Sequence, residues 1–110
     1  MTTKIKVQGK RGSWFAEISG ISYPCVHEFW VQRGKSMTYN DPIHDQEDRH
    51  WPDFLAALQS QKKAILTKDV TPDGGINFTR TGYIALYAID DVVKDTSLRF
   101  RFVQRLAECE

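Results

Sequence analysis

The last third of the chain constrains the fold most strongly, because it consists of apolar, often β-branched runs separated by turn signals. The run Tyr83–Val93 is apolar on both faces, and a strand of this kind must be covered on both faces. Pro72-Asp73-Gly74-Gly75 and Lys94-Asp95-Thr96-Ser97 have compositions typical of turns. The strands expected in this region are Ile65–Val70, Ile76–Arg80, Tyr83–Val93 and Leu98–Leu106.

The first third alternates apolar and polar residues with the period of two that indicates half-buried strands. The strands expected there are Lys4–Gln8, Ser13–Ser19 and Tyr23–Gln32. Pro24 cannot donate a hydrogen bond to a neighbouring strand, so we expect it near a strand start or on a sheet edge. The segment Arg33–Arg49 has no steady period and is expected to form an irregular loop.

One α-helix is expected over about residues 52–62. Pro52 suits the first helical position, where its missing N–H is no loss. Trp51, Phe54, Leu55 and Leu58 then form one apolar stripe at helical spacing. We therefore predict a single domain over residues 1–110 of the mainly β (α+β) class. Its architecture is expected to be a strongly bent antiparallel sheet or small β-barrel with one packed α-helix.

The composition is ordinary for a soluble globular protein, with 41% hydrophobic and 26% charged residues. No apolar run approaches the roughly 20 residues of a membrane helix, so no membrane association is expected. The first residues lack a hydrophobic signal core, which favours a cytoplasmic location. Cys25 and Cys109 fit a reducing compartment, although a disulfide between them is the alternative if the C-terminal end folds back beside Cys25.

His27 and Cys25 are the candidates for chemistry. They lie two residues apart on an expected strand, so their side chains share a face that is otherwise apolar. A core histidine bonded to a backbone carbonyl is one interpretation. The other is a small enzyme in which His27 acts as a base or ligand in a pocket closed by the 33–49 loop.

The polar segment before the expected helix is a weak candidate for a metal site. Residues 41–53 contain five acidic side chains, one arginine and two histidines. His44, His50 and Asp45 have side chains that suit zinc, manganese or iron, but their spacing matches no compact metal motif. A solvated acidic loop at a helix N-terminus is the alternative, and the 33–50 loop is also the candidate surface for a protein partner.

Basic residues gather on the expected first and last strands. Pairing of the two strands would merge them into one basic face able to bind phosphate groups. The solvent face of an antiparallel sheet is the alternative interpretation. Trp30 and Tyr39 are candidates for stacking on nucleobases, and Trp30 is also a candidate for the core. The candidate basic residues are Lys4, Lys6, Lys10, Arg99, Arg101 and Arg105.

No glycine-rich phosphate loop, nucleophile elbow or dinucleotide-binding fingerprint is present, and no cofactor is expected. We therefore predict a small, non-catalytic recognition module that binds an anionic partner, with nucleic acid or a nucleotide as the favoured class. The alternatives are a protein–protein interaction, inhibitor or accessory protein, and the small enzyme centred on His27. An exposed first or last strand would also suit a second copy of the chain, as in a homodimer.

Overall fold

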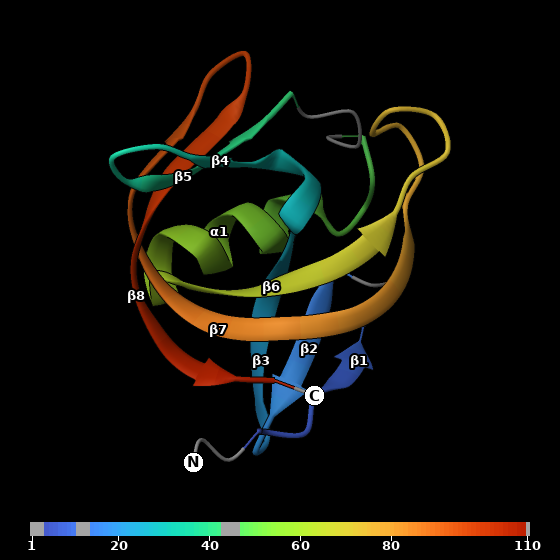
Figure 1. The fold of residues 1–110 in the computed structure, drawn as a ribbon, viewed down its shortest axis with the longest axis vertical. Coiled ribbons are helices and arrows are strands. Elements are labelled where there is room, and N and C mark those ends of the chain that lie inside the picture. Colours follow the sequence, from blue (N-terminus) through green and yellow to red (C-terminus); the bar gives the residue numbers. More distant parts are fainter. Residues whose placement is uncertain (1–3, 11–13, 43–46, 110) are drawn as a thin grey trace.

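The computed structural model describes residues 4–10, 14–42 and 47–109. Eight strands form one strongly curved sheet that wraps around a single α-helix, as Figure 1 shows. The predicted mainly β (α+β) class with one packed helix is confirmed. The strands are β1 (Gln8–Lys10), β2 (Phe15–Ile18), β3 (Ile21–His27), β4 (Val31–Arg33), β5 (Met37–Asp41), β6 (Lys63–Val70), β7 (Thr79–Lys94) and β8 (Leu98–Glu108). The helices are the short 3-10 helix η2 (Glu28–Trp30) and α1 (Trp51–Gln61).

The strand order across the sheet is β1-β2-β3-β6-β7-β8-β5-β4. Strands β3 and β6 pair in parallel, and the other neighbouring strands pair antiparallel. The parallel pair requires a long crossover, and the chain between β3 and β6 supplies it with β4, β5 and α1. The edge strands are β1 and β4. The last strand, β8, pairs with β7 along its length and with β5 only over its first four residues, Leu98 to Arg101.

Four sequence expectations about strands are corrected. The expected strand Lys4–Gln8 is not formed: residues 4–7 carry one isolated bridge at Ile5, and β1 spans Gln8–Lys10. The expected strand Tyr23–Gln32 ends at His27, where the chain enters η2 and then resumes as β4. The loop expected over Arg33–Arg49 contains β5, which pairs with both β4 and β8. The expected strands Ile76–Arg80 and Tyr83–Val93 form one strand instead, because β7 spans Thr79–Lys94 with only shifts in register against β6.

Pro24 lies within β3 rather than at a sheet edge, and the local pairing explains why this position tolerates proline. The neighbouring Cys25 N–H donates to the Trp14 carbonyl at 3.0 Å, on the β2 side. Backbone directions alternate along a strand, so the Pro24 nitrogen faces the β6 side. The ladder with β6 begins only at Cys25, and no hydrogen bond is lost at Pro24.

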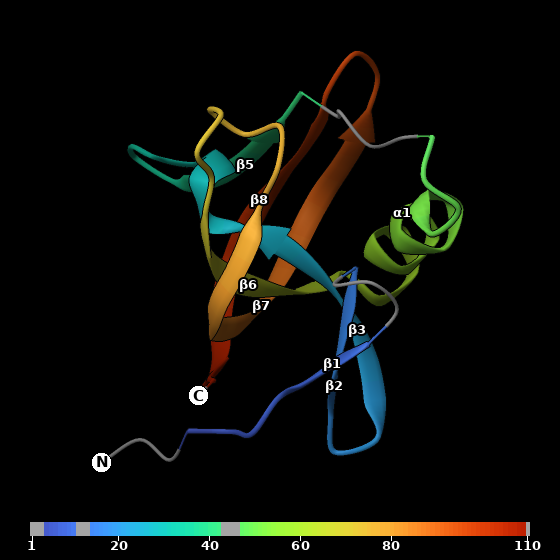
Figure 2. The ribbon, with the colours of Figure 1, turned by 90° about the vertical axis from the view of Figure 1, so that its right-hand side faces the viewer.

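The main core lies between the concave sheet and α1 (Figure 2). Helix α1 contributes the buried Phe54 and Leu58, as the apolar stripe in the sequence predicts. Burying a leucine or phenylalanine side chain contributes about 1.5–3 kcal/mol each, so these contacts hold α1 on the sheet. The sheet residues of this core include Phe15, Val26, Leu66, Tyr87, Leu98, Phe100 and Phe102.

A second, smaller core lies on the other face of the sheet. It is built from Ala16, Ile18, Tyr23, Cys25, Ile65, Leu86 and Cys109. The N-terminal segment packs Ile5 and Val7 against it, and the Ile5 N–H donates to the Glu108 carbonyl at 2.8 Å. An isolated parallel bridge joins Ile5 to Cys109. The two ends of the described chain are therefore fixed beside each other.

Candidate functional site

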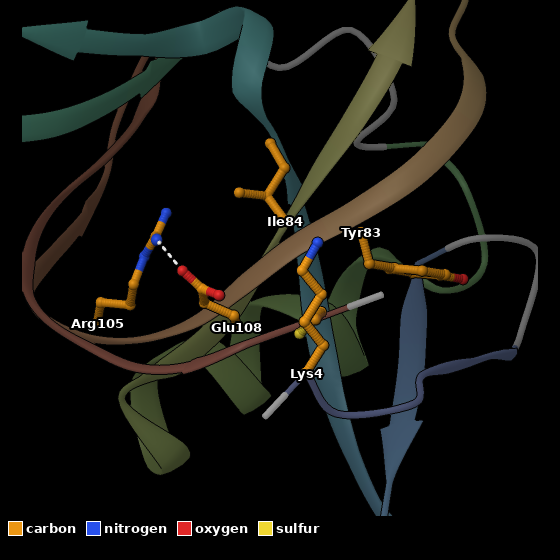
Figure 3. Close-up of a pocket in the computed structure, with 6 residues that line it drawn as sticks. Lys4, Tyr83, Ile84, Arg105 and Glu108 are labelled. Atoms are coloured by element: carbon orange, nitrogen blue, oxygen red, sulfur yellow. Dashed lines mark hydrogen bonds and ion pairs between the residues drawn. The ribbon is translucent and has the colours of Figure 1, made fainter. Parts of the chain in front are cut away.

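One basic residue of the N-terminal segment and one of β8 line the same pocket. Lys4 and Arg105 line a pocket of about 250 Å³, shown in Figure 3. The backbone contact between Ile5 and Glu108 sets this juxtaposition, because it places the N-terminal segment alongside the end of β8. The remaining lining residues are Tyr83, Ile84, Glu108 and Cys109.

Arg105 is held in a defined orientation within this pocket. Its Nε donates to the Tyr87 hydroxyl and its Nη1 donates to Glu108 Oε1, both at 3.2 Å. The hydrogen bond with Tyr87 and the charge of Glu108 raise the pKa of Arg105 above its ordinary value. The pocket thus combines two cations with one carboxylate, an arrangement that can accept an anionic group.

Arg99 and Arg101 do not line this pocket and form ion pairs with aspartates instead. Arg99 Nη2 lies 2.5 Å from Asp95 Oδ2, and Arg101 forms two hydrogen bonds to Asp90, at 2.9 and 2.6 Å. The hydrogen bonds from Arg101 lower the pKa of Asp90 below its ordinary value, which keeps this carboxylate ionised. These pairs are exposed, and exposed ion pairs contribute little to stability. Each nevertheless places a carboxylate where a phosphate would bind.

The single merged basic face that strand pairing would have produced is not formed. Strand β1 pairs with β2, and β8 pairs with β7 and β5. Within the described residues, the terminal segments are joined at the isolated Ile5–Cys109 bridge. Lys6 is exposed on the N-terminal segment, Lys10 ends β1, and Lys4 lines a pocket together with Arg105.

A second candidate site lies on the face of the second core, at the end of β3. His27 is directly opposite Thr67 on β6, and Asp69 on β6 is directly opposite Arg80 on β7. Residues two apart on a strand share a face, so Cys25, His27, Thr67 and Asp69 extend this apolar face into a polar cluster. The strand register thus assembles the cluster.

Asp69 is the hub of this cluster. Its side chain is only 2% exposed, and its Oδ2 lies 2.9 Å from His27 Nδ1 and 2.6 Å from Thr67 Oγ1. Arg80 Nε approaches Oδ1 at 3.4 Å. Burial alone would raise the pKa of Asp69, but the hydrogen bonds from His27 and Thr67 and the charge of Arg80 outweigh burial, and the pKa is lowered.

Aromatic rings cover one face of His27. The Phe78 ring stacks on the imidazole with a centroid separation of 3.8 Å and an interplanar angle of 7°. Phe29 and Trp30 pack edge-on against Phe78, at centroid separations of 5.9 and 6.3 Å. Phe29 remains 51% exposed, so one large aromatic surface stays in contact with solvent beside the histidine.

The loop before β7 is tied down by Asp73. The Asn77 N–H and the Asn77 side-chain amide both donate to Asp73, at 2.8 and 2.6 Å. These bonds lower the pKa of Asp73. Gly75 lies directly beneath the Trp30 ring, where a Cβ atom would approach within 2.4 Å. This short loop therefore fixes both Phe78 and Trp30.

Cys25 lies in the interior, where burial favours the protonated thiol. The residue is 5% exposed, and burial raises the pKa of its thiol to about 12, although the nearby Arg80 charge opposes the shift. A thiol that remains protonated is a poor nucleophile. Cys25 and Cys109 are both free and buried.

The two candidate stacking residues are both largely enclosed. Tyr39 is 1% exposed, stacks on Phe100 at 4.7 Å and donates its hydroxyl hydrogen to Asp41. Trp30 packs against the main core. Tyr39 thus offers no ring face to a nucleobase, and the exposed aromatic residue in this region is Phe29.

Of the candidate metal ligands, His44 and Asp45 lie outside the described residues. His50 is the residue before α1, and its backbone N–H donates to Asp48 at 2.8 Å. Within residues 4–10, 14–42 and 47–109, no three His, Cys, Asp or Glu side chains converge in a way that could hold a metal ion.

Sequence reasoning named His27 but missed its partners Thr67, Asp69, Arg80 and Phe78. The alternation along β6 does place Thr67 and Asp69 on one face. The parallel pairing of β3 with β6 is a contact between distant segments, and no local pattern in the sequence indicates it.

No family model, curated protein or solved structure matches the chain. Among the described residues, no helix has the length and apolar character needed to cross a membrane.

Proposed function

We propose that the protein is a small recognition module that binds an anionic partner, with nucleic acid or a nucleotide as the favoured class. The observation that carries the proposal is that Lys4 and Arg105 line the same pocket. Lysine contributes a compact point charge, and arginine contributes a planar group that can bind phosphate with two hydrogen bonds. A cytoplasmic location belongs to the same proposal and is supported by the two free thiols.

Glu108 gives the proposal a sharp internal test. Its carboxylate accepts a hydrogen bond from Arg105 Nη1, so it competes with any anionic ligand for that donor. Replacing Lys4 and replacing Glu108 should therefore have opposite effects on affinity, because one removes a cation and the other removes the competing anion. A surface that binds anions only through its overall charge would respond to charge changes at any exposed site.

The experiment measures binding of a labelled single-stranded oligonucleotide by fluorescence anisotropy across a salt series. Lys4→Gln should weaken binding severalfold and lower the salt slope by about one. Glu108→Gln should strengthen binding. Lys94→Gln, at the exposed end of β7, removes the same charge far along the strand and should change little.

The proposal fails if no binding is detected at low salt, or if the Lys4 and Lys94 variants lose affinity equally. The second result would assign binding to net charge rather than to the pocket.

A further inference from the structure

The polar cluster at the end of β3 fixes both the tautomer and the orientation of His27. Nδ1 lies 2.9 Å from Asp69 Oδ2, and the lowered pKa of Asp69 keeps this carboxylate ionised. An ionised carboxylate can only accept hydrogen bonds, so Nδ1 carries the hydrogen and the lone pair of the neutral ring is on Nε2. The stacked Phe78 ring and the hydrogen bond from the His27 N–H to the Tyr39 hydroxyl restrain the residue further.

The ring remains accessible to a ligand. The His27 side chain is 24% exposed, whereas the Asp69 side chain on its Nδ1 side is 2% exposed. No hydrogen bond to Nε2 is found among the residues that the structure describes. The cluster therefore has the parts of a general base: an oriented imidazole, a buried carboxylate that holds its tautomer, and an open acceptor atom.

The chain offers this base no nucleophile of its own in the described cluster. The Cys25 thiol is buried and its pKa is raised to about 12. The Thr67 hydroxyl is fully buried and lies 2.6 Å from Asp69. The nucleophile would therefore be water or a group of the substrate itself.

RNA is the class of anionic ligand that carries such a nucleophile, because its 2′-hydroxyl lies next to the phosphorus atom that it can attack. The half-exposed Phe29 ring beside His27 and Phe78 provides a surface for an adjacent base to stack on. The choice of nucleic acid as substrate rests on the proposed function, and the inference adds a catalytic step to binding.

We propose that His27, positioned by Asp69, is the general base of a metal-independent cleavage of single-stranded RNA. His27 Nε2 accepts the proton of the 2′-hydroxyl, and the 2′-oxygen forms a bond to the adjacent phosphorus. The bond from phosphorus to the 5′-oxygen breaks, and the departing oxygen takes a proton from the imidazolium or from water. The products are a 2′,3′-cyclic phosphate and a free 5′-hydroxyl, and no oxidant or reductant is required.

The experiment incubates the purified protein with a fluorescent single-stranded RNA in the presence of EDTA and follows the cyclic phosphate product by mass spectrometry. His27→Gln should lower the cleavage rate by about 100-fold or more. His50→Gln is the matched control, since it removes a histidine that precedes α1, and should cleave like the parent protein. Circular dichroism confirms that each variant is folded.

Asp69 is a positioning residue, so its test needs a readout that a purely structural role would not change. The groups that face His27 are Asp69 from β6, Arg80 from β7 and the Tyr39–Asp41 pair from β5. Asp69→Asn should lower the cleavage rate more than about tenfold, because the imidazole is no longer held in its tautomer, while binding of the uncleavable 2′-O-methyl RNA stays as in the parent protein. A merely structural role would lower binding and cleavage together. If Asp69→Asn does not fold, Thr67→Val replaces it as the test variant, because it keeps the side-chain shape but removes the hydrogen bond from Thr67 to Asp69.

The same sequence with 2′-O-methyl groups separates this inference from the proposed function, because it binds as RNA does but lacks the nucleophile. Binding of this analogue without cleavage of RNA overturns the inference and leaves the proposed function standing. Absence of both overturns both. Cleavage that persists in His27→Gln also overturns the inference, because the activity then does not depend on this histidine.

Discussion

At the scale of single residues, burial determines which groups can react. Asp69 is almost completely enclosed yet stays ionised, because three donors surround it. Cys25 lies on the same face and is equally enclosed, but only Arg80 opposes the effect of burial on its thiol. The same environment therefore stabilises a charged carboxylate and a neutral thiol side by side.

The neutral Cys25 thiol predicts a loss of stability at alkaline pH. Its pKa is raised from 9.0 to about 12 in the folded protein, so folding favours the protonated form. This contribution to stability is complete below about pH 9 and is lost as the pH rises toward 12. The free energy of unfolding, measured by urea denaturation across this range, should fall with pH. Cys25→Ala should lessen the dependence, and an unchanged slope in that variant would contradict the assignment.

At the scale of elements, the loop between β6 and β7 positions the aromatic rings around His27. Gly74 and Gly75 both have positive φ angles, +70° and +104°, which favour glycine. They differ in their surroundings: a Cβ on Gly74 would meet nothing within 4 Å, whereas a Cβ on Gly75 would collide with Trp30.

This difference gives a matched pair of variants. Gly74→Ala should cost about 1–2 kcal/mol of unfolding free energy, from backbone strain alone. Gly75→Ala should cost more and should also shift the tryptophan fluorescence, because the Trp30 ring must move. Chemical denaturation and emission spectra measure the two effects. Equal costs with unchanged spectra would show that Trp30 does not pack on this loop.

Local patterns in the sequence predicted where helices and strands form better than they predicted which strands pair. The stripe that includes Phe54 and Leu58 predicted α1, and the expected strand Leu98–Leu106 corresponds to β8, because these signals depend on neighbours in the chain. The pairing of β3 with β6 depends on segments about forty residues apart. The ion pair between Asp90 and Arg101 could not be predicted from local patterns either, since it depends on the register of β7 against β8.

At the scale of the whole molecule, the N-terminal segment closes the second core. Ile5 packs against that core, whereas the adjacent Lys6 is exposed. Ile5→Ser should therefore lower the free energy of unfolding by about 1–3 kcal/mol, while Lys6→Ser should change it little. Thermal unfolding measures the difference. Hydrogen exchange at the Cys109 amide, which bonds to the Ile84 carbonyl at 2.9 Å, should accelerate only in the Ile5 variant. Equal melting temperatures for the two variants would mean that this segment does not contribute to the core.

Ile5 and Cys109 lie side by side. The strands could therefore be connected in a different order along the chain and still pair in the same way. A short peptide could join the segments at Ile5 and Cys109 without crossing the protein, and the chain could be reopened at the exposed Gly34-Lys35-Ser36 turn between β4 and β5. In such a circular permutant Lys4 and Arg105 would become close neighbours in sequence as well as in space.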